Sequence, residues 1–251
     1  MKAPIAVALD AQDAETAARW ALAVTPYVAV VKVGLELFCR VGPSIVKSVR
    51  GASGTELFLD LKLHDIPNTV AGAVRAVGRH KPRYLTVHAG GGAGMVRAAV
   101  EAADDVIIAA VTVLTSMSQE ALAATGLGGP PLDAARRLAV LAVGAGAGAV
   151  VCSPHEVAAV RAEVGAGVVL ITPGVRPAGT DAHDQARVAT PEQALADGAD
   201  LLVIGRPITG ALDPGAAAAR IAASLQPGGP DQPGGWRTAA TPTLPPGPAR
   251  R

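Results

Sequence analysis

Short apolar runs rich in β-branched residues recur along the chain and alternate with alanine-rich segments of helical periodicity. Continuous apolar runs of this length are typical of strands that are buried on both faces. The helical segments include residues 15–24, 154–164 and 191–196. The apolar runs that we interpret as strands cover residues 5–9, 28–31, 56–61, 84–87, 106–113, 149–151, 168–171 and 201–204.

Strands that alternate with helices in this way predict a parallel sheet, and eight such units predict a (β/α)8 TIM barrel. We therefore expect one barrel domain over residues 1–225. The alternative is a doubly wound open sheet, but its dinucleotide-binding glycine pattern is absent because the spacing in Gly90–Gly94 is wrong. We interpret those glycines as a tight turn into a helix, and Gly144–Gly148 as a helix end followed by a loop.

The chain changes character at Gln226, where proline and glycine become frequent and apolar periodicity ends. Such a segment cannot bury enough apolar surface to offset the entropy lost on ordering. Residues 226–251 are therefore predicted to form a disordered tail outside the barrel domain.

Composition narrows the range of functions. Half of the residues are hydrophobic, but only 2% are aromatic, and 22 basic residues nearly balance 21 acidic ones. A balanced charge does not favour nucleic acid as a partner, so we expect a small-molecule substrate. Neither a signal peptide nor a membrane span is predicted, and Cys39 and Cys152 lack the spacing of a metal site. These features predict a cytoplasmic protein in which each cysteine packs as a small apolar residue.

The most informative run covers residues 60–69, Asp-Leu-Lys-Leu-His-Asp-Ile-Pro-Asn-Thr, and directly follows an apolar strand. Side chains alternate between the two faces of a strand, so Asp60 and Lys62 lie on the same face. Asp65 follows in the loop, and two carboxylates are therefore expected to flank one ammonium group. Pro67 suits the first turn of a helix, which places this charged run at a strand-to-helix junction.

Functional residues of such barrels lie at the carboxyl ends of the strands, and phosphate commonly binds after strands seven and eight. Arg176, Gly205 and Arg206 follow those two strands. The guanidinium group of arginine binds two phosphate oxygens at once, and glycine lets backbone N–H groups approach the phosphate closely. We expect a phosphate site there, with residues 175–185 as a candidate lid. His88 ends strand four without a second ligand at metal spacing, so we predict a hydrogen-bonded structural role and no metal.

The run 60–69 resembles the signature of the orotidine 5'-phosphate decarboxylases. Further segments at the other strand ends match in order, at residues 7–10, 31–34, 114–116, 172–177, 184–188 and 203–208. The resemblance implies decarboxylation of orotidine 5'-phosphate to uridine 5'-phosphate (UMP) in pyrimidine synthesis, without cofactor or metal, by a homodimer with shared active sites.

The resemblance also implies a role for individual residues. Asp10 and Lys32 would hold the ribose, Lys32 also belonging to the catalytic charge array, and Lys62 would be the proton donor beside Asp60. Asp65 and Thr69 would reach the active site of the partner subunit, and Thr115 would contact the pyrimidine. The phosphate would be bound by Arg176, Gln185, Gly205 and Arg206.

Two other functions remain open at this stage. The first is a Mg2+-dependent keto-sugar-phosphate decarboxylase or synthase of the same barrel superfamily, which uses a similar Asp-x-Lys-x-x-Asp run. The second is a catalytically silent barrel that binds a nucleotide or a protein as a regulatory module. Intact Lys32, Asp60, Lys62 and Asp65 argue against the second.

Overall fold

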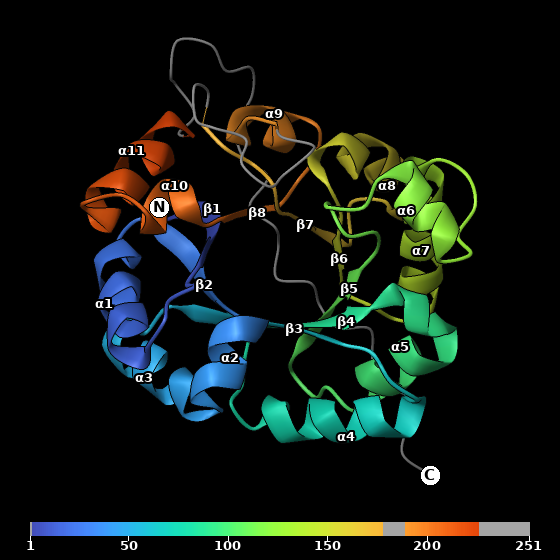
Figure 1. Ribbon diagram of the computed structural model, residues 1–251, viewed down its shortest axis with the longest axis horizontal. Helices are drawn as coiled ribbons and strands as arrows, with labels where there is room; N and C mark the ends of the chain where they lie inside the picture. Colours follow the sequence, from blue (N-terminus) through green and yellow to red (C-terminus); the bar gives the residue numbers. More distant parts are fainter. Residues whose placement is uncertain (1, 178–188, 226–251) are drawn as a thin grey trace.

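Eight parallel strands close into a barrel, and helices surround it (Figure 1). The computed structural model describes residues 2–177 and 189–225. Each strand pairs with its sequence neighbours, and β8 pairs with β1 to close the sheet. The strands are β1 Ala3–Ala8, β2 Val28–Gly34, β3 Glu56–Leu63, β4 Tyr84–His88, β5 Ile107–Val111, β6 Ala149–Val151, β7 Val169–Thr172 and β8 Leu201–Ile204.

The helices lie on the outside of the barrel (Figure 1). Most of them connect successive strands, and α10 and α11 follow the last strand. The α-helices are α1 Ala14–Val24, α2 Leu35–Val41, α3 Ser44–Ser53, α4 Pro67–Gly78, α5 Gly92–Glu101, α6 Gln119–Ala124, α7 Pro131–Gly144, α8 Val157–Val164, α9 Pro191–Ala196, α10 Arg206–Thr209 and α11 Pro214–Ser224. Two 3-10 turns, η1 Ala89–Gly91 and η2 Pro154–Glu156, precede α5 and α8.

The predicted barrel is confirmed, and the alternative of an open sheet is wrong. Each apolar run lies in or around one strand, although β2 and β3 extend beyond the predicted ends, to Gly34 and Leu63. Pro67 is the first residue of α4, as predicted. The segment 154–164 begins as the 3-10 turn η2 before it continues as α8. The predicted tail, residues 226–251, lies outside the described residues, as do Gln185 and most of the candidate lid.

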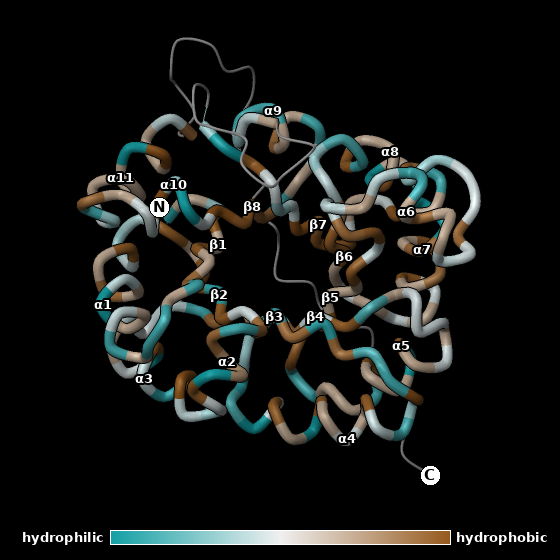
Figure 2. Tube along the Cα trace, in the orientation of Figure 1, coloured by the Kyte–Doolittle hydropathy of each residue, from teal (hydrophilic) through white to brown (hydrophobic). Residues whose placement is uncertain are grey.

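Two apolar layers stabilise the barrel. One fills its interior and includes Phe58 and Tyr84, whose rings pack edge to face with centroids 5.8 Å apart. The other lies between the strands and the surrounding helices. Figure 2 shows the hydrophobic positions concentrated on the strands. Because successive side chains of a strand point to opposite sides, each strand contributes alternately to the two layers.

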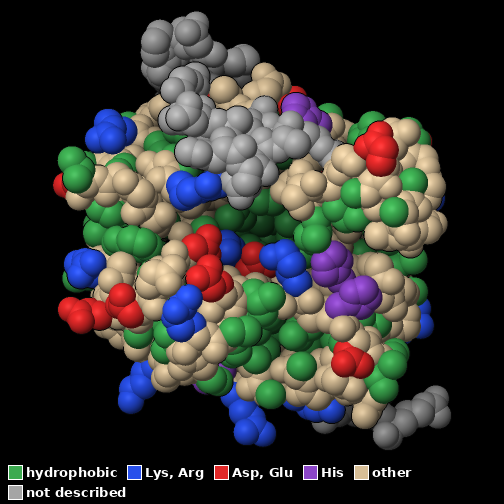
Figure 3. Space-filling view, in the orientation of Figure 1, with side chains coloured by type: hydrophobic (Ala, Val, Ile, Leu, Met, Phe, Trp, Pro, Cys, Tyr) green, Lys and Arg blue, Asp and Glu red, His purple; other side chains and the backbone are tan. Residues whose placement is uncertain are grey.

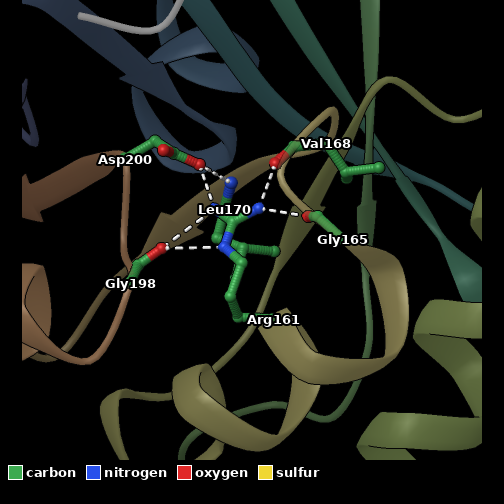
Figure 4. A network of polar contacts seen from close by, with 6 residues as sticks. All are labelled: Arg161, Gly165, Val168, Leu170, Gly198 and Asp200. Carbon is green, nitrogen blue, oxygen red and sulfur yellow. Dashed lines mark hydrogen bonds and ion pairs between the residues drawn. The ribbon is translucent and has the colours of Figure 1, made fainter. Parts of the chain in front are cut away.

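A polar network connects the amino-terminal ends of β7 and β8, the end of these strands away from their C-terminal loops (Figure 4). The guanidinium of Arg161 donates to the backbone oxygens of Gly165, Val168 and Gly198, and it pairs with the carboxylate of Asp200. The same carboxylate accepts a hydrogen bond from the backbone N–H of Leu170 at 2.7 Å. Arg161 therefore holds together the segments that directly precede β7 and β8.

The structure also tests two expectations about the surface. Cys152 is buried as expected, but Cys39 is exposed on α2, so the expectation that both cysteines pack in the interior is wrong for Cys39. Among the described residues, no helix has both the length and the hydrophobicity needed to cross a membrane.

Candidate active site

Charged side chains gather at the carboxyl-terminal mouth of the barrel (Figure 3). The interior-facing positions of β2 and β3 are apolar lower down, at Val30 and Phe58. Two residues further along each strand, the same face carries Lys32 and Asp60, and Lys62 follows on β3. The alternation predicted from sequence thus brings these charges together inside the mouth of the barrel.

Four of the predicted residues form a row of alternating charge. The Nζ of Lys62 lies 2.8 Å from Oδ1 of Asp60, and the Nζ of Lys32 lies 3.3 Å from Oδ2 of the same carboxylate. Lys32 also lies 3.7 Å from Asp10. The Lys32 side chain is 8% exposed, whereas that of Lys62 is 35% exposed. Lys62 is therefore the lysine whose ammonium group is open to a ligand.

The Asp60 carboxylate stays ionised at neutral pH. Burial alone would raise its pKa, but the positive charges of Lys32 and Lys62 and the hydrogen bonds from Lys62 and Thr86 outweigh burial. The pKa of Asp60 is therefore held below its ordinary value. A permanently charged carboxylate in turn keeps both ammonium groups in place.

Two features of the backbone make room for this row. Gly34 pairs with Asp60 across β2 and β3. A Cβ at Gly34 would lie 3.0 Å from the Asp10 carboxylate and 3.1 Å from the Lys32 ammonium, so a larger residue would crowd their contact. Lys62 itself has a φ of 49°, in the left-handed region that non-glycine residues seldom adopt.

A cavity of about 130 Å³, open to solvent, lies next to the charged row. Asp60 and Lys62 form its polar side above the ring of Phe58. The remaining lining residues are mostly apolar and lie in strands five to eight or directly after them: Val111, Val113, Leu114, Thr115, Val151, Cys152, Pro173 and Val203. The cavity therefore suits a small ligand with both an apolar surface and polar groups.

The predicted phosphate-binding residues follow neighbouring strands at the same mouth. Arg176 is buried, and its backbone N–H donates to the oxygen of Ala189 at 3.0 Å. Gly205 and Arg206 lie directly after β8, where Arg206 is exposed. Gln185 lies outside the described residues.

Asp65 does not flank Lys62 within one chain, which corrects the prediction of two carboxylates around one ammonium group. Its carboxylate accepts a hydrogen bond from the backbone N–H of Ile66 at 2.6 Å and is exposed. Among the described ion pairs, Lys62 contacts Asp60 alone. Thr69, in the first turn of α4, is also exposed.

His88 makes a ring contact, and no hydrogen bond of its imidazole to another described residue replaces or accompanies it, so the predicted hydrogen bond is absent there. Its imidazole stacks on that of His64, with ring centroids 5.4 Å apart. Burial lowers the pKa of His88, and the charges of His64 and Lys62 lower it further, against an opposing effect of Asp60. Within residues 2–177 and 189–225, no cluster of three or more potential metal ligands is present.

The sequence reasoning missed Thr86 and Gly34, which contact the charged row without carrying charge. The signal for Thr86 was its position in the apolar run of β4, two residues before His88 and on the same face. A lone hydroxyl in such a run is the clue to a polar neighbour, because buried polar groups are normally hydrogen-bonded.

Comparisons with known proteins identify the family of the chain. Residues 3–221 match the model of the orotidine 5'-phosphate decarboxylase / HUMPS family. The chain is 71% identical to orotidine 5'-phosphate decarboxylase of Thermobifida fusca, over 90% of this chain and 97% of that protein. It is 61% identical to the enzyme of the same name from Frankia casuarinae, over 91% of this chain and 89% of that protein.

A solved structure gives the same result for the fold. The crystal structure of orotidine 5'-phosphate decarboxylase from Lactobacillus acidophilus matches with a TM-score of 0.76 and 34% identity, and it covers 88% of this chain and 97% of that one. The barrel, the charged row at its mouth and these similarities establish that the chain belongs to the orotidine 5'-phosphate decarboxylase / HUMPS family.

Proposed function

We propose that Lys62 and Asp60 catalyse the decarboxylation of orotidine 5'-phosphate to UMP. The reaction follows from the family and from the relatives named above: the chain is a carboxy-lyase of the decarboxylation step in pyrimidine biosynthesis. The observation that supports the residue roles is the Asp60 carboxylate held between the ammonium groups of Lys32 and Lys62, beside the cavity.

The mechanism follows from the charges. The bond between ring carbon six and the carboxylate breaks, carbon dioxide leaves, and the electron pair stays on carbon six. The pyrimidine cannot delocalise this pair through its π system, so a fixed ammonium group lowers the barrier. At ~4 Å and an effective dielectric of ~20, such a pair is worth about 4 kcal/mol. Lys62 then transfers a proton from Nζ to carbon six, and it regains a proton from solvent.

The remaining substrate contacts follow from position around the mouth. Asp10 and Lys32 would hold the ribose, and Thr115 would contact the pyrimidine beside the apolar wall. Arg176, Gln185, Gly205 and Arg206 would bind the phosphate. Binding energy from the phosphate would help to hold the reacting ring against Lys62.

The phosphate role has its own test. Arg206→Ala should weaken the binding of UMP at least tenfold, about 1.4 kcal/mol, and leave the weak binding of uridine nearly unchanged. Calorimetric titration of both ligands measures this difference. Equal losses for the two ligands would mean that Arg206 supports the fold instead.

A homodimer with shared active sites fits the surface around Asp65. Ile66 is 67% exposed and Leu35 is 52% exposed, and both follow neighbouring strands at the mouth. Exposed apolar residues beside the site favour a protein contact there. In a two-fold dimer, Asp65 and Thr69 of one chain would reach Lys62 of the other.

We also propose a cytoplasmic location. Both cysteines are free, which fits a reducing compartment, where disulfides are rare.

A single assay tests the reaction and its independence of metal. The purified protein is mixed with orotidine 5'-phosphate, with and without excess EDTA, and the loss of substrate absorbance is followed. We expect equal turnover in both samples. Loss of activity in EDTA would contradict catalysis without metal. No turnover in either sample would favour a Mg2+-dependent sugar-phosphate enzyme or the silent barrel.

A further inference from the structure

We infer that Thr86 is a positioning residue, whose hydroxyl aligns the Lys62 backbone and the Asp60 carboxylate for catalysis. The inference rests on the proposed role of Lys62. Thr86 lies in the middle of β4 and carries no charge, and its side chain is fully buried.

The hydroxyl of Thr86 joins the two catalytic residues directly. Its Oγ1 accepts a hydrogen bond from the backbone N–H of Lys62 at 2.8 Å and donates one to Oδ1 of Asp60 at 3.0 Å. The same carboxylate oxygen receives the Lys62 ammonium at 2.8 Å. A hydroxyl has one proton to donate, so accepting from Lys62 leaves that proton for Asp60. Thr86, Asp60 and Lys62 thus form a closed ring of contacts.

The hydroxyl acts where the sheet is irregular. Leu59 pairs with Leu85, but the next pair is Leu63 with Val87. Over this interval β3 advances four residues while β4 advances two, so β3 bulges. Such a bulge re-aims the side chains within it. Lys62 lies inside the bulge with its left-handed φ of 49°, a conformation that costs an ordinary residue free energy. The Thr86 hydroxyl binds the Lys62 N–H at this point and thereby stabilises the bulge.

Two consequences distinguish a positioning role from simple packing. Without the hydroxyl, the Lys62 backbone is less constrained, so the ammonium group is placed less well in the transition state and kcat falls while KM changes little. The Asp60 carboxylate also loses one of the hydrogen bonds that favour its charged form, so its pKa rises.

Thr86→Val removes the hydroxyl and keeps the shape, and Thr86→Ser keeps the hydroxyl. We expect kcat to fall roughly 10- to 100-fold in Thr86→Val, as two hydrogen bonds are lost, and to stay within about threefold of wild type in Thr86→Ser. The acid limb of the kcat/KM profile should move to higher pH in Thr86→Val alone.

Thr112→Val is the matched control. Thr112 is similarly buried, and its hydroxyl donates to the oxygen of Val151 at 2.9 Å. The odd-numbered positions of β5, such as Ala109, face the interior, and even-numbered Ala110 faces the helices. Thr112 directly follows β5 at an even-numbered position, so it points away from the cavity. Thr112→Val should lose stability in urea as Thr86→Val does, yet keep its kcat and its pH profile.

A crystal structure of Thr86→Val gives a readout that does not need turnover. We expect Lys62 to leave the left-handed region, or the Lys62–Asp60 contact to lengthen. If Thr86→Val does not fold, Thr86→Ala takes its place. The inference would be overturned if the site geometry of Thr86→Val were unchanged, or if its acid limb did not move and its kcat stayed within twofold of wild type. It would also be overturned if folded Thr86→Ser lost as much kcat as Thr86→Val. None of these results affects the proposed reaction, which fails only if the wild type does not convert orotidine 5'-phosphate.

Discussion

At the scale of single residues, one carboxylate organises the site. Asp60 binds the ammonium groups of Lys32 and Lys62 at 3.3 and 2.8 Å, and its low pKa keeps it charged. Lys62 is held in place and yet remains the more exposed lysine. These properties are those expected of a group that must meet a substrate and deliver a proton.

Lys62→Ala should reduce kcat by at least three decades. The loss of ~4 kcal/mol of charge stabilisation alone corresponds to that factor, and the variant also lacks the proposed proton donor. Far-UV circular dichroism and urea unfolding should show a folded protein, since Lys62 lies at the mouth and outside the apolar core. Turnover within tenfold of wild type would rule out Lys62 as the proton donor.

His88 should make the protein less stable in mild acid. Its pKa in the folded state lies below the value of about 6.5 in the unfolded chain, so the unfolded state binds the proton more readily. The free energy of unfolding should therefore decrease as the pH falls below about 6.5, until the folded pKa is reached.

His88→Asn should lose this part of the pH dependence between pH 7.5 and 5, measured from urea unfolding curves. His155→Asn is the control, because His155 is exposed and distant in sequence from the charged row. If the free energy of unfolding depends on pH in the same way in wild type and in His88→Asn, the lowered pKa of His88 is contradicted.

Which residues could be predicted depended on whether their roles follow from spacing. Asp60 and Lys62 share a face because they are two positions apart on a strand, and that needs no tertiary information. The distance of Asp65 from Lys62 depends on the path of the loop. The hydroxyl of Thr86 indicates a polar neighbour, but the identity of that neighbour depends on a bulge in β3. The sequence of β4 does not reveal that bulge.

At the scale of elements, the strands were predictable because strands buried on both faces read as continuous apolar runs. Their ends were less predictable. The last residues of β2 and β3 are Gly34 and Leu63, beyond the charges of Lys32 and Lys62, which interrupt the apolar run although the backbone pairing continues. The proposed catalytic groups are therefore part of rigid strands rather than of loops.

The Arg161 network also could not be predicted, because its partners are mostly backbone oxygens of two separate turns. Arg161→Ala should lower the free energy of unfolding by roughly 3 kcal/mol, since the half-buried Asp200 carboxylate loses its ion pair and the backbone oxygens of Val168 and Gly198 lose their donor. Turnover should persist, because the network lies at the opposite ends of β7 and β8 from Arg176 and Arg206.

Arg136→Ala is the control for this measurement. Arg136 pairs with Glu163 of α8 on the exposed surface, so its removal should cost much less. If urea unfolding shows a similar loss of free energy of unfolding for the two variants, the stabilising role of the Arg161 network is contradicted.

At the scale of the whole molecule, one chain brings together only four of the five charged groups that we propose for the row in the active site. Asp10, Lys32, Asp60 and Lys62 alternate in sign, but the fifth member, Asp65, points to the exposed surface beside Ile66. A second chain related by a two-fold axis would bring its own Asp65 to Lys62. The catalytic charge array would then be complete in the dimer alone.

Mixing Lys62→Ala chains with Asp65→Ala chains tests most directly whether Lys62 works beside Asp60 of its own chain and Asp65 of a second chain. Each variant alone should be inactive. In a heterodimer, one site collects both changes, and the other pairs intact Lys62 with intact Asp65. Half of the dimers are heterodimers after random exchange, so activity should return to about a quarter of wild type. If mass spectrometry verifies exchange and no activity returns, the shared site is contradicted.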